Sequence, residues 1–127
     1  MSAATEMQAA LIEALGAVAD LTGVYDGPPA RAAYPYAAIG EAVSGDWSTK
    51  DARGRELRLA VTIHDDGASP ARLHGLMAAA EDAIEAIPRD LPTHRIASLV
   101  FLRGRIIRDA AGPWAGLIEY RARLLER

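Results

Sequence analysis

Arginine is the residue type most able to do chemistry in this chain, and it gathers towards the C-terminal end. Guanidinium groups on neighbouring strands would follow a phosphate backbone, which is the basis of sequence-independent nucleic-acid binding. They would equally pair with carboxylates at Glu119, Asp109 and Glu126, or with a neighbouring subunit. We favour pairing, because the net charge is −3 and no DNA-binding motif is recognised. The arginines are Arg103, Arg105, Arg108, Arg121, Arg123 and Arg127.

Histidine occurs at three positions that share no metal-binding spacing. His64, His74 and His94 fall on different expected elements, and none has a second imidazole four residues away. The run from His64 through two aspartates ends just before Gly67, which is typical of an ordinary loop at a strand end rather than a cation site. The sequence predicts no metal and no cofactor.

No catalytic arrangement accompanies these residues. The serines lack a nucleophile elbow, and the glycines form neither a phosphate-binding loop nor a dinucleotide fingerprint. Cysteine is absent, which excludes disulfides, thiolate metal sites and a thiol nucleophile. We therefore expect a protein that is not an enzyme.

Charge is distributed unevenly along the chain. Residues 1–88 carry 6 basic and 13 acidic side chains, a net charge of −7, whereas residues 89–127 carry 8 and 4, a net charge of +4. If the two parts occupy different faces, the basic face of one copy can meet the acidic face of the next, which favours head-to-tail contacts and rings. A solvated surface without a partner is the alternative, and charge alone does not separate the two.

Two segments have helical periodicity and two have the alternation of strands. Residues 5–19 and 70–87 predict helices, the second with Ser69 as N-cap and Pro70 as its first residue. Strands are expected at residues 56–64, the clearest alternation, and at residues 36–43, and a short extended piece fits residues 24–25.

A polar loop at residues 44–54 holds Trp47 and the only lysine, Lys50. A tryptophan in such a loop either folds back onto its own domain or inserts into a pocket of a partner. Its polar and charged neighbours favour the second role.

Residues 95–109 and 113–125 predict a long hairpin. The polar sets agree if Asp109 pairs with Pro113 across residues 110–112, so that Arg103 faces Glu119. Parity then places these side chains on one apolar face: Val100, Leu102, Ile106, Trp114, Ile118, Tyr120 and Leu124. The other face would hold Arg103, Arg105, Arg121 and Arg123 together with Leu99, Phe101 and Leu117, a mixture suited to cover by another subunit.

The length of the chain and its N-terminus limit its organisation. With 127 residues, half of them hydrophobic, it fits a single domain over residues 1–127. The N-terminus has no basic stretch followed by an apolar run, and no segment approaches the roughly 20 apolar residues of a membrane span. We expect assembly in the cytoplasm and no contact with a membrane.

Five short motifs in order resemble the phage tail completion proteins, a family long catalogued as a domain of unknown function. After the first helix come VYDGPP at residues 24–29, AYPY at residues 33–36, Gly40-Glu41 and DWSTK at residues 46–50. A strand ending near His64, an alanine-rich helix and a closing hairpin with YRA at residues 120–122 follow in the same order. The alanine- and arginine-rich style is similar to that of versions found in gene transfer agents.

The resemblance implies a tail terminator or head–tail joining subunit in a phage-like particle assembled in the bacterial cytoplasm. It implies an α+β fold, with an antiparallel or mixed sheet of about four strands and two main helices packed on it. The expected partners are further copies in a ring, hexameric by the resemblance, a tail-tube protein and a neck, stopper or head-completion protein. DNA would pass through the channel without specific binding. The candidate interface residues are Tyr34, Tyr36, Asp46, Trp47, Lys50, Arg103, Arg105, Arg121 and Arg123.

Overall fold

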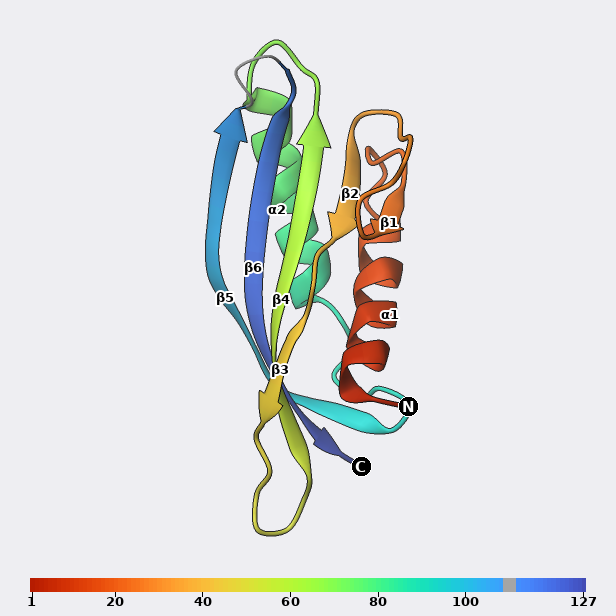
Figure 1. Cartoon of the computed structure of the whole chain (residues 1–127), viewed down its shortest axis with the longest axis vertical. Coiled ribbons are helices and arrows are strands. Elements are labelled where there is room, and N and C mark those ends of the chain that lie inside the picture. Colours follow the sequence, from red (N-terminus) through yellow and green to blue (C-terminus); the bar gives the residue numbers. More distant parts are fainter. Residues whose placement is uncertain (109–111) are drawn as a thin grey trace.

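The computed structural model describes residues 1–108 and 112–127, which form a helical layer packed on one face of a sheet (Figure 1). The expected α+β class is confirmed, but the sheet has six strands rather than about four. The elements are α1 (Ala3–Gly16), β1 (Val24–Asp26), β2 (Tyr36–Ile39), β3 (Val43–Asp46), β4 (Gly54–Asp65), α2 (Ala71–Glu85), β5 (His94–Arg108) and β6 (Trp114–Glu126). Neither helix in these residues is long and apolar enough to cross a membrane.

The sheet is mixed and follows the order β1-β2-β4-β6-β5. β1 runs parallel to β2, and the other neighbours are antiparallel. The two additional strands are edge pieces of three and four residues: β1, which contains the short extended piece expected at residues 24–25, and β3, which is too short for alternation to reveal.

The single strand expected over residues 36–43 is wrong, because the structure divides this segment between β2 and β3. Both pair with the same edge of β4, β2 with its residues 61–64 and β3 with its residues 55–58. Between them the backbone N–H of Gly40 still donates to the carbonyl of Ala60, at 2.8 Å. The long strand β4 therefore organises one whole side of the sheet.

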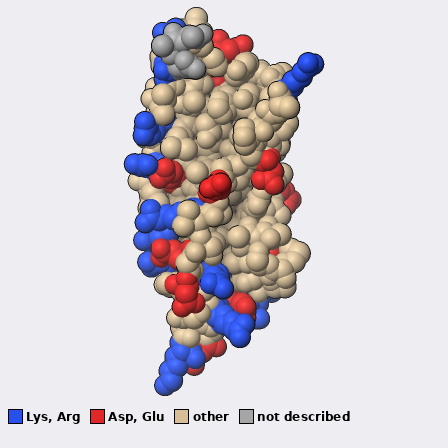
Figure 2. Space-filling view, viewed as in Figure 1, with Lys and Arg blue, Asp and Glu red and all other residues tan. Residues whose placement is uncertain are grey.

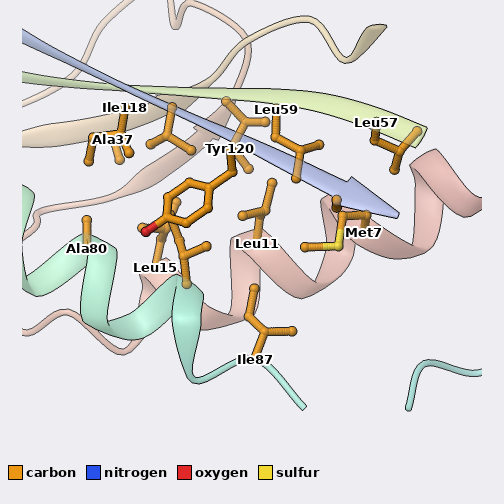
Figure 3. Packing of buried hydrophobic residues seen from close by; sticks show 14 of the residues in the cluster. Met7, Leu11, Leu15, Ala37, Leu57, Leu59, Ala80, Ile87, Ile118 and Tyr120 are labelled. Atoms are coloured by element: carbon orange, nitrogen blue, oxygen red, sulfur yellow. The ribbon is translucent and has the colours of Figure 1, made fainter. Parts of the chain in front are cut away.

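One hydrophobic cluster joins both helices to the sheet. Tyr120 of β6 lies at its centre, close to Leu11 and Leu15 of α1 and to Ala80 of α2 (Figure 3). The Tyr120 hydroxyl donates to Glu85 Oε2 at 2.9 Å, which satisfies the polar atom that this core side chain brings. Burial, followed by this hydrogen bond, raises the pKa of Tyr120.

The helix boundaries differ from those expected by a few residues. α1 begins at Ala3 because Ser2 caps it, accepting a hydrogen bond from the Thr5 N–H at 3.1 Å. α2 begins at Ala71, so Pro70 is the residue before the helix, and the Ser69 hydroxyl accepts a long hydrogen bond from the Ala71 N–H at 3.4 Å. The prediction of Ser69 as N-cap was wrong by one position.

The hairpin register is confirmed near its turn and shifts further down. Arg103 is opposite Glu119, as parity predicts, and Arg108 is opposite Trp114. The expected pairing of Asp109 with Pro113 and the loop at residues 110–112 fall wholly or partly outside the described residues.

Two bulges in β5 change which side chains face the helices. The register shifts at Leu102 and again at Ala97, and each shift moves the following residues to the opposite face. Phe101 and Leu99 therefore lie opposite Tyr120 and Ala122 on the helix side, so their assignment to the polar face was wrong. Val100 is opposite Arg121 on the other face, so its assignment to the apolar face was also wrong, whereas Leu102 is the inserted residue of the bulge and has no cross-strand partner.

A buried polar cluster fastens the start of α1 to the start of β5. The Glu6 carboxylate accepts hydrogen bonds from the N–H and the hydroxyl of Thr93, both at 2.6 Å, and it contacts His94 Nδ1. Burial alone would raise the pKa of Glu6, but the bonds from Thr93 and His94 outweigh it and lower the pKa to about 2.

Candidate interaction surface

The face of the sheet opposite the helices is left uncovered by the rest of the described chain. In Figure 1, α2 lies behind β4 and β6, so Figure 2 looks onto this open face, where charges gather along the β5 edge and the lower end. The strand registers place six arginines and two glutamates on it: Arg58, Arg95, Arg103, Arg105, Arg121, Arg123, Glu56 and Glu119. The four hairpin arginines predicted to share a face do share it.

Charge is segregated between the two layers. The helices α1 and α2 together hold five carboxylates and one arginine, whereas β5 and β6 hold six arginines and two carboxylates. The charge asymmetry along the chain therefore becomes an asymmetry between opposite sides of the fold.

Two of the open-face arginines are neutralised within the sheet. Arg103 donates through Nε and Nη2 to the Glu119 carboxylate, at 3.0 and 3.1 Å. Arg123 Nε donates to Glu56 Oε2 at 2.8 Å, a bond that lowers the pKa of Glu56. Such partly exposed ion pairs fix side-chain positions more than they add stability.

Arg58 and Arg121 differ from these pairs. They are Cα partners on β4 and β6, so two residues of like charge occupy directly opposite positions on the open face. Within residues 1–108 and 112–127, neither forms an ion pair, and Arg121 Nε is buried without a hydrogen-bond partner. Arg58 was not among the predicted interface residues.

Trp47 folds back onto its own sheet. Its ring is half-buried, and Arg123 Cζ lies 5.4 Å from the ring centroid, within the range of a cation–π contact. The neighbouring loop residues remain exposed: Asp46 accepts a hydrogen bond from the Ser48 hydroxyl at 2.7 Å, and Lys50 lies on the outside.

An aromatic group occupies the other end of the face. Tyr36 stacks on His64 with ring centroids 4.8 Å apart, and Tyr25 and Tyr34 contact Tyr36 at 5.8 and 5.5 Å. Burial, followed by the neighbouring tyrosines, raises the pKa of Tyr36. Tyr36 and Asp46 pair with positions nine residues apart on β4, which separates them by about 30 Å. The predicted interface residues therefore form a surface rather than one site.

The polar residues considered earlier for metal binding are held by other contacts. His64 belongs to the aromatic group, and the buried Asp65 accepts hydrogen bonds from Arg72 of α2. This bond, opposed by burial, lowers the pKa of Asp65. Residues 1–108 and 112–127 contain no group of three side chains that could hold a metal ion.

A groove lies between α1 and the C-terminal end of α2. It has a volume of about 500 Å3 and is lined mainly by alanines, with Ile87, Leu91 and Pro92. Three carboxylates line the groove: Glu6, Glu13 and Asp90. The Glu6 carboxylate already accepts a hydrogen bond from Thr93. Such a lining does not bring together the groups of an acid–base or nucleophilic site.

A model of the tail completion protein gp17 family matches residues 6–125. The chain belongs to this family. Its members are structural tail proteins rather than a class of enzymes, and the resemblance predicted from the five motifs is confirmed. A search of curated proteins finds no match for this tail completion protein.

Two solved structures share the fold of this tail completion protein. One is a chain in the virion of a native gene transfer agent particle, with a TM-score of 0.74, 26% sequence identity and 98% of each chain covered. The other is the bacteriophage SPP1 gp17 protein, with a TM-score of 0.63, 23% identity, and 94% of this chain and 89% of that chain covered. The second likeness, at its lower identity, concerns the fold alone.

Proposed function

We propose that this tail completion protein is a virion subunit that forms a ring at the head–tail junction, caps the tail tube and joins it to the neck. The observation that carries the proposal is the open sheet face. Helices cover only one side of the sheet, and the other carries six arginines, four of them exposed, among apolar side chains such as Val100 and Ile107. A structural subunit has such a face when a neighbour covers it in the assembled particle.

The likeness to a chain of the gene transfer agent virion supports this location. That chain is covered over almost its full length and shares 26% of its residues with this one. The proposed partners are therefore other copies of the chain, the tail-tube protein and a neck or head-completion protein. A ring of six copies and a channel that DNA passes through follow from the family resemblance.

The proposal is tested by deleting the gene for this protein in cells that produce the particles. A cap ends the growth of the tube and provides the surface on which the head docks. Without it, we expect tubes of uncontrolled length and heads without tails, and normal particles after the protein is supplied again. Particles of normal length carrying attached heads in its absence would contradict the proposal.

Sequence-independent nucleic-acid binding is the second candidate function, and the Arg58–Arg121 pair favours it. Against it, Arg103 and Arg123 already bind Glu119 and Glu56, which leaves fewer free cations for a phosphate backbone. Binding to duplex DNA of arbitrary sequence that falls steeply with salt concentration would support this second function.

A further inference from the structure

Within residues 1–108 and 112–127, neither Arg58 nor Arg121 of the open face forms an ion pair, although Glu56 lies near enough to interact with both electrostatically. Like charges directly opposite each other destabilise a pair of strands, and a buried polar atom without a partner has an unfavourable free energy. The nearby carboxylates Glu56 and Glu119 are hydrogen-bonded to Arg123 and Arg103 instead. An acid from outside the chain would neutralise the pair and accept from Arg121 Nε.

An excess of carboxylates, opposite in charge to the arginine pair, lies on the helical layer. Glu81, Asp82 and Glu85 occupy the last turns of α2, near the negative end of the helix dipole, and none forms an ion pair within residues 1–108 and 112–127. Burial, then repulsion from its two acidic neighbours, raises the pKa of Glu81. The adjoining outer surface of α2 is small and flat, formed by exposed Gly75, Ala78 and Ala79.

We propose that Arg58 and Arg121 of one copy dock on the acidic end of α2, at Glu81 and Asp82, of a second copy. Six arginines against two glutamates on the open face complement the four carboxylates that remain at the helix surface beside one arginine, since Glu6 is buried. The inference rests on the proposed function, because it names the contact that joins neighbouring subunits of the ring.

Apolar side chains on the same face favour a protein over DNA as the occupant. Val100, opposite Arg121, is 39% exposed, and Val43, opposite Arg58, is 65% exposed. Both flank the arginine pair, and a protein surface of small side chains would remove them from water, whereas a phosphate backbone would leave them wet. The two complementary surfaces lie on opposite layers, so each copy can bind a neighbour on both sides, and such head-to-tail contacts form a ring when the rotation between successive copies closes.

Charge exchange tests the pairing. Arg121→Glu, and separately the double change Glu81→Arg with Asp82→Arg, should each weaken self-association by at least about 100-fold, because like charges then meet at the contact. The three changes together should restore it. Arg31→Glu, which makes the same charge change in an exposed loop, is the matched control and should leave self-association unchanged. Thermal unfolding of each variant checks that the fold is intact.

Two outcomes of this exchange would overturn the inference. One is unchanged self-association in the single-surface variants. The other is a triple variant that folds but stays as defective as its parents. If Arg121→Glu also abolishes salt-dependent affinity for duplex DNA while self-association is unaffected, the arginine pair serves nucleic acid instead.

Cross-linking tests the contact directly. Because the chain has no cysteine, only the introduced cysteines can react. A variant with both Arg58→Cys and Asp82→Cys should give a ladder of covalent multimers with a short bis-maleimide, in concentrated protein or in assembled particles. Each single-cysteine variant should stay monomeric. Dimers from a single-cysteine variant would show a contact between identical surfaces, and no ladder from assembled particles that contain the protein would overturn the inference.

These results separate the inference from the proposed function. A ladder from a protein that is located away from the head–tail junction would keep the inference and remove the function. A ring at the junction whose subunits give no ladder would support the proposed function and overturn the inference.

Discussion

The guanidinium of Arg123 lies over the indole of Trp47 while its Nε donates to Glu56, so one arginine joins the loop after β3 to both β4 and β6. The loop is thereby held against the open face of the sheet. A side chain that stacks on a single arginine and remains half-exposed can still contribute to a contact with another subunit.

Replacement of Trp47 by alanine separates these two contributions. The lost cation–π contact and partial burial should lower the free energy of unfolding by about 1–2 kcal/mol, whereas assembly into particles should fall much further. Denaturant unfolding and the yield of complete particles are the two measurements, with Trp47→Phe as the conservative control. Early melting combined with complete particles would show that Trp47 serves only its own fold.

Gly54 allows the close approach of this loop to β4. A Cβ at Gly54 would lie 2.4 Å from the carbonyl oxygen of Trp47 and 3.0 Å from that of Leu124, both backbone atoms. Gly54→Ala should therefore cost about 1–3 kcal/mol and weaken the Trp47 contact, seen as a change in tryptophan fluorescence. Gly45→Ala is the control, since no atom lies within 4 Å of its Cβ position. Equal stability of the two variants would contradict this view of the loop.

The Glu6 cluster predicts a specific dependence of stability on pH. The pKa of Glu6 is lowered from 4.5 to about 2, so its contribution is complete above pH 4.5 and is lost as the pH falls towards 2. A shift of this size corresponds to roughly 3 kcal/mol. Glu6→Gln should lose about that much at neutral pH and should show a flatter decline between pH 4.5 and 2. A parallel decline in both proteins would show that Glu6 is not the group responsible.

The Asp65–Arg72 pair should contribute through the buried partner. Arg72→Ala would leave the buried Asp65 carboxylate without the bonds from Nε, and we expect a loss of about 1–3 kcal/mol, reduced by the exposure of Arg72. The variant with both Arg72→Ala and Asp65→Asn should recover part of that loss. Thermal unfolding at neutral pH tests this, and an additive double variant would indicate that the two residues act independently.

The Arg103–Glu119 pairing could be predicted because it depends only on the period of a strand and the length of a loop. The face on which Phe101 lies could not be predicted, since a bulge at Leu102 inserts one residue and reverses residues 98–101, until the second bulge at Ala97 restores the original parity. Neither bulge position holds a glycine or a proline, the residues that most often mark an irregular strand, so nothing in the sequence marks the shift.

Arg58 illustrates the same limit for the interaction surface. The alternation of residues 56–64 puts Arg58 on the polar side of its strand. Its significance comes from Arg121, which is 63 positions away and lies beside it only because β6 is placed between β4 and β5. Pairing between strands that are distant in the chain leaves no local pattern. The face of the hairpin arginines was predictable, and their partners across β4 were not.

Imaging the protein in assembled particles tests the central claim most directly. The account predicts a closed ring of identical subunits at the head–tail junction, joined head to tail, with the open sheet face of each copy against the helices of the next. A single copy, a two-fold dimer, or a position away from the junction would contradict it.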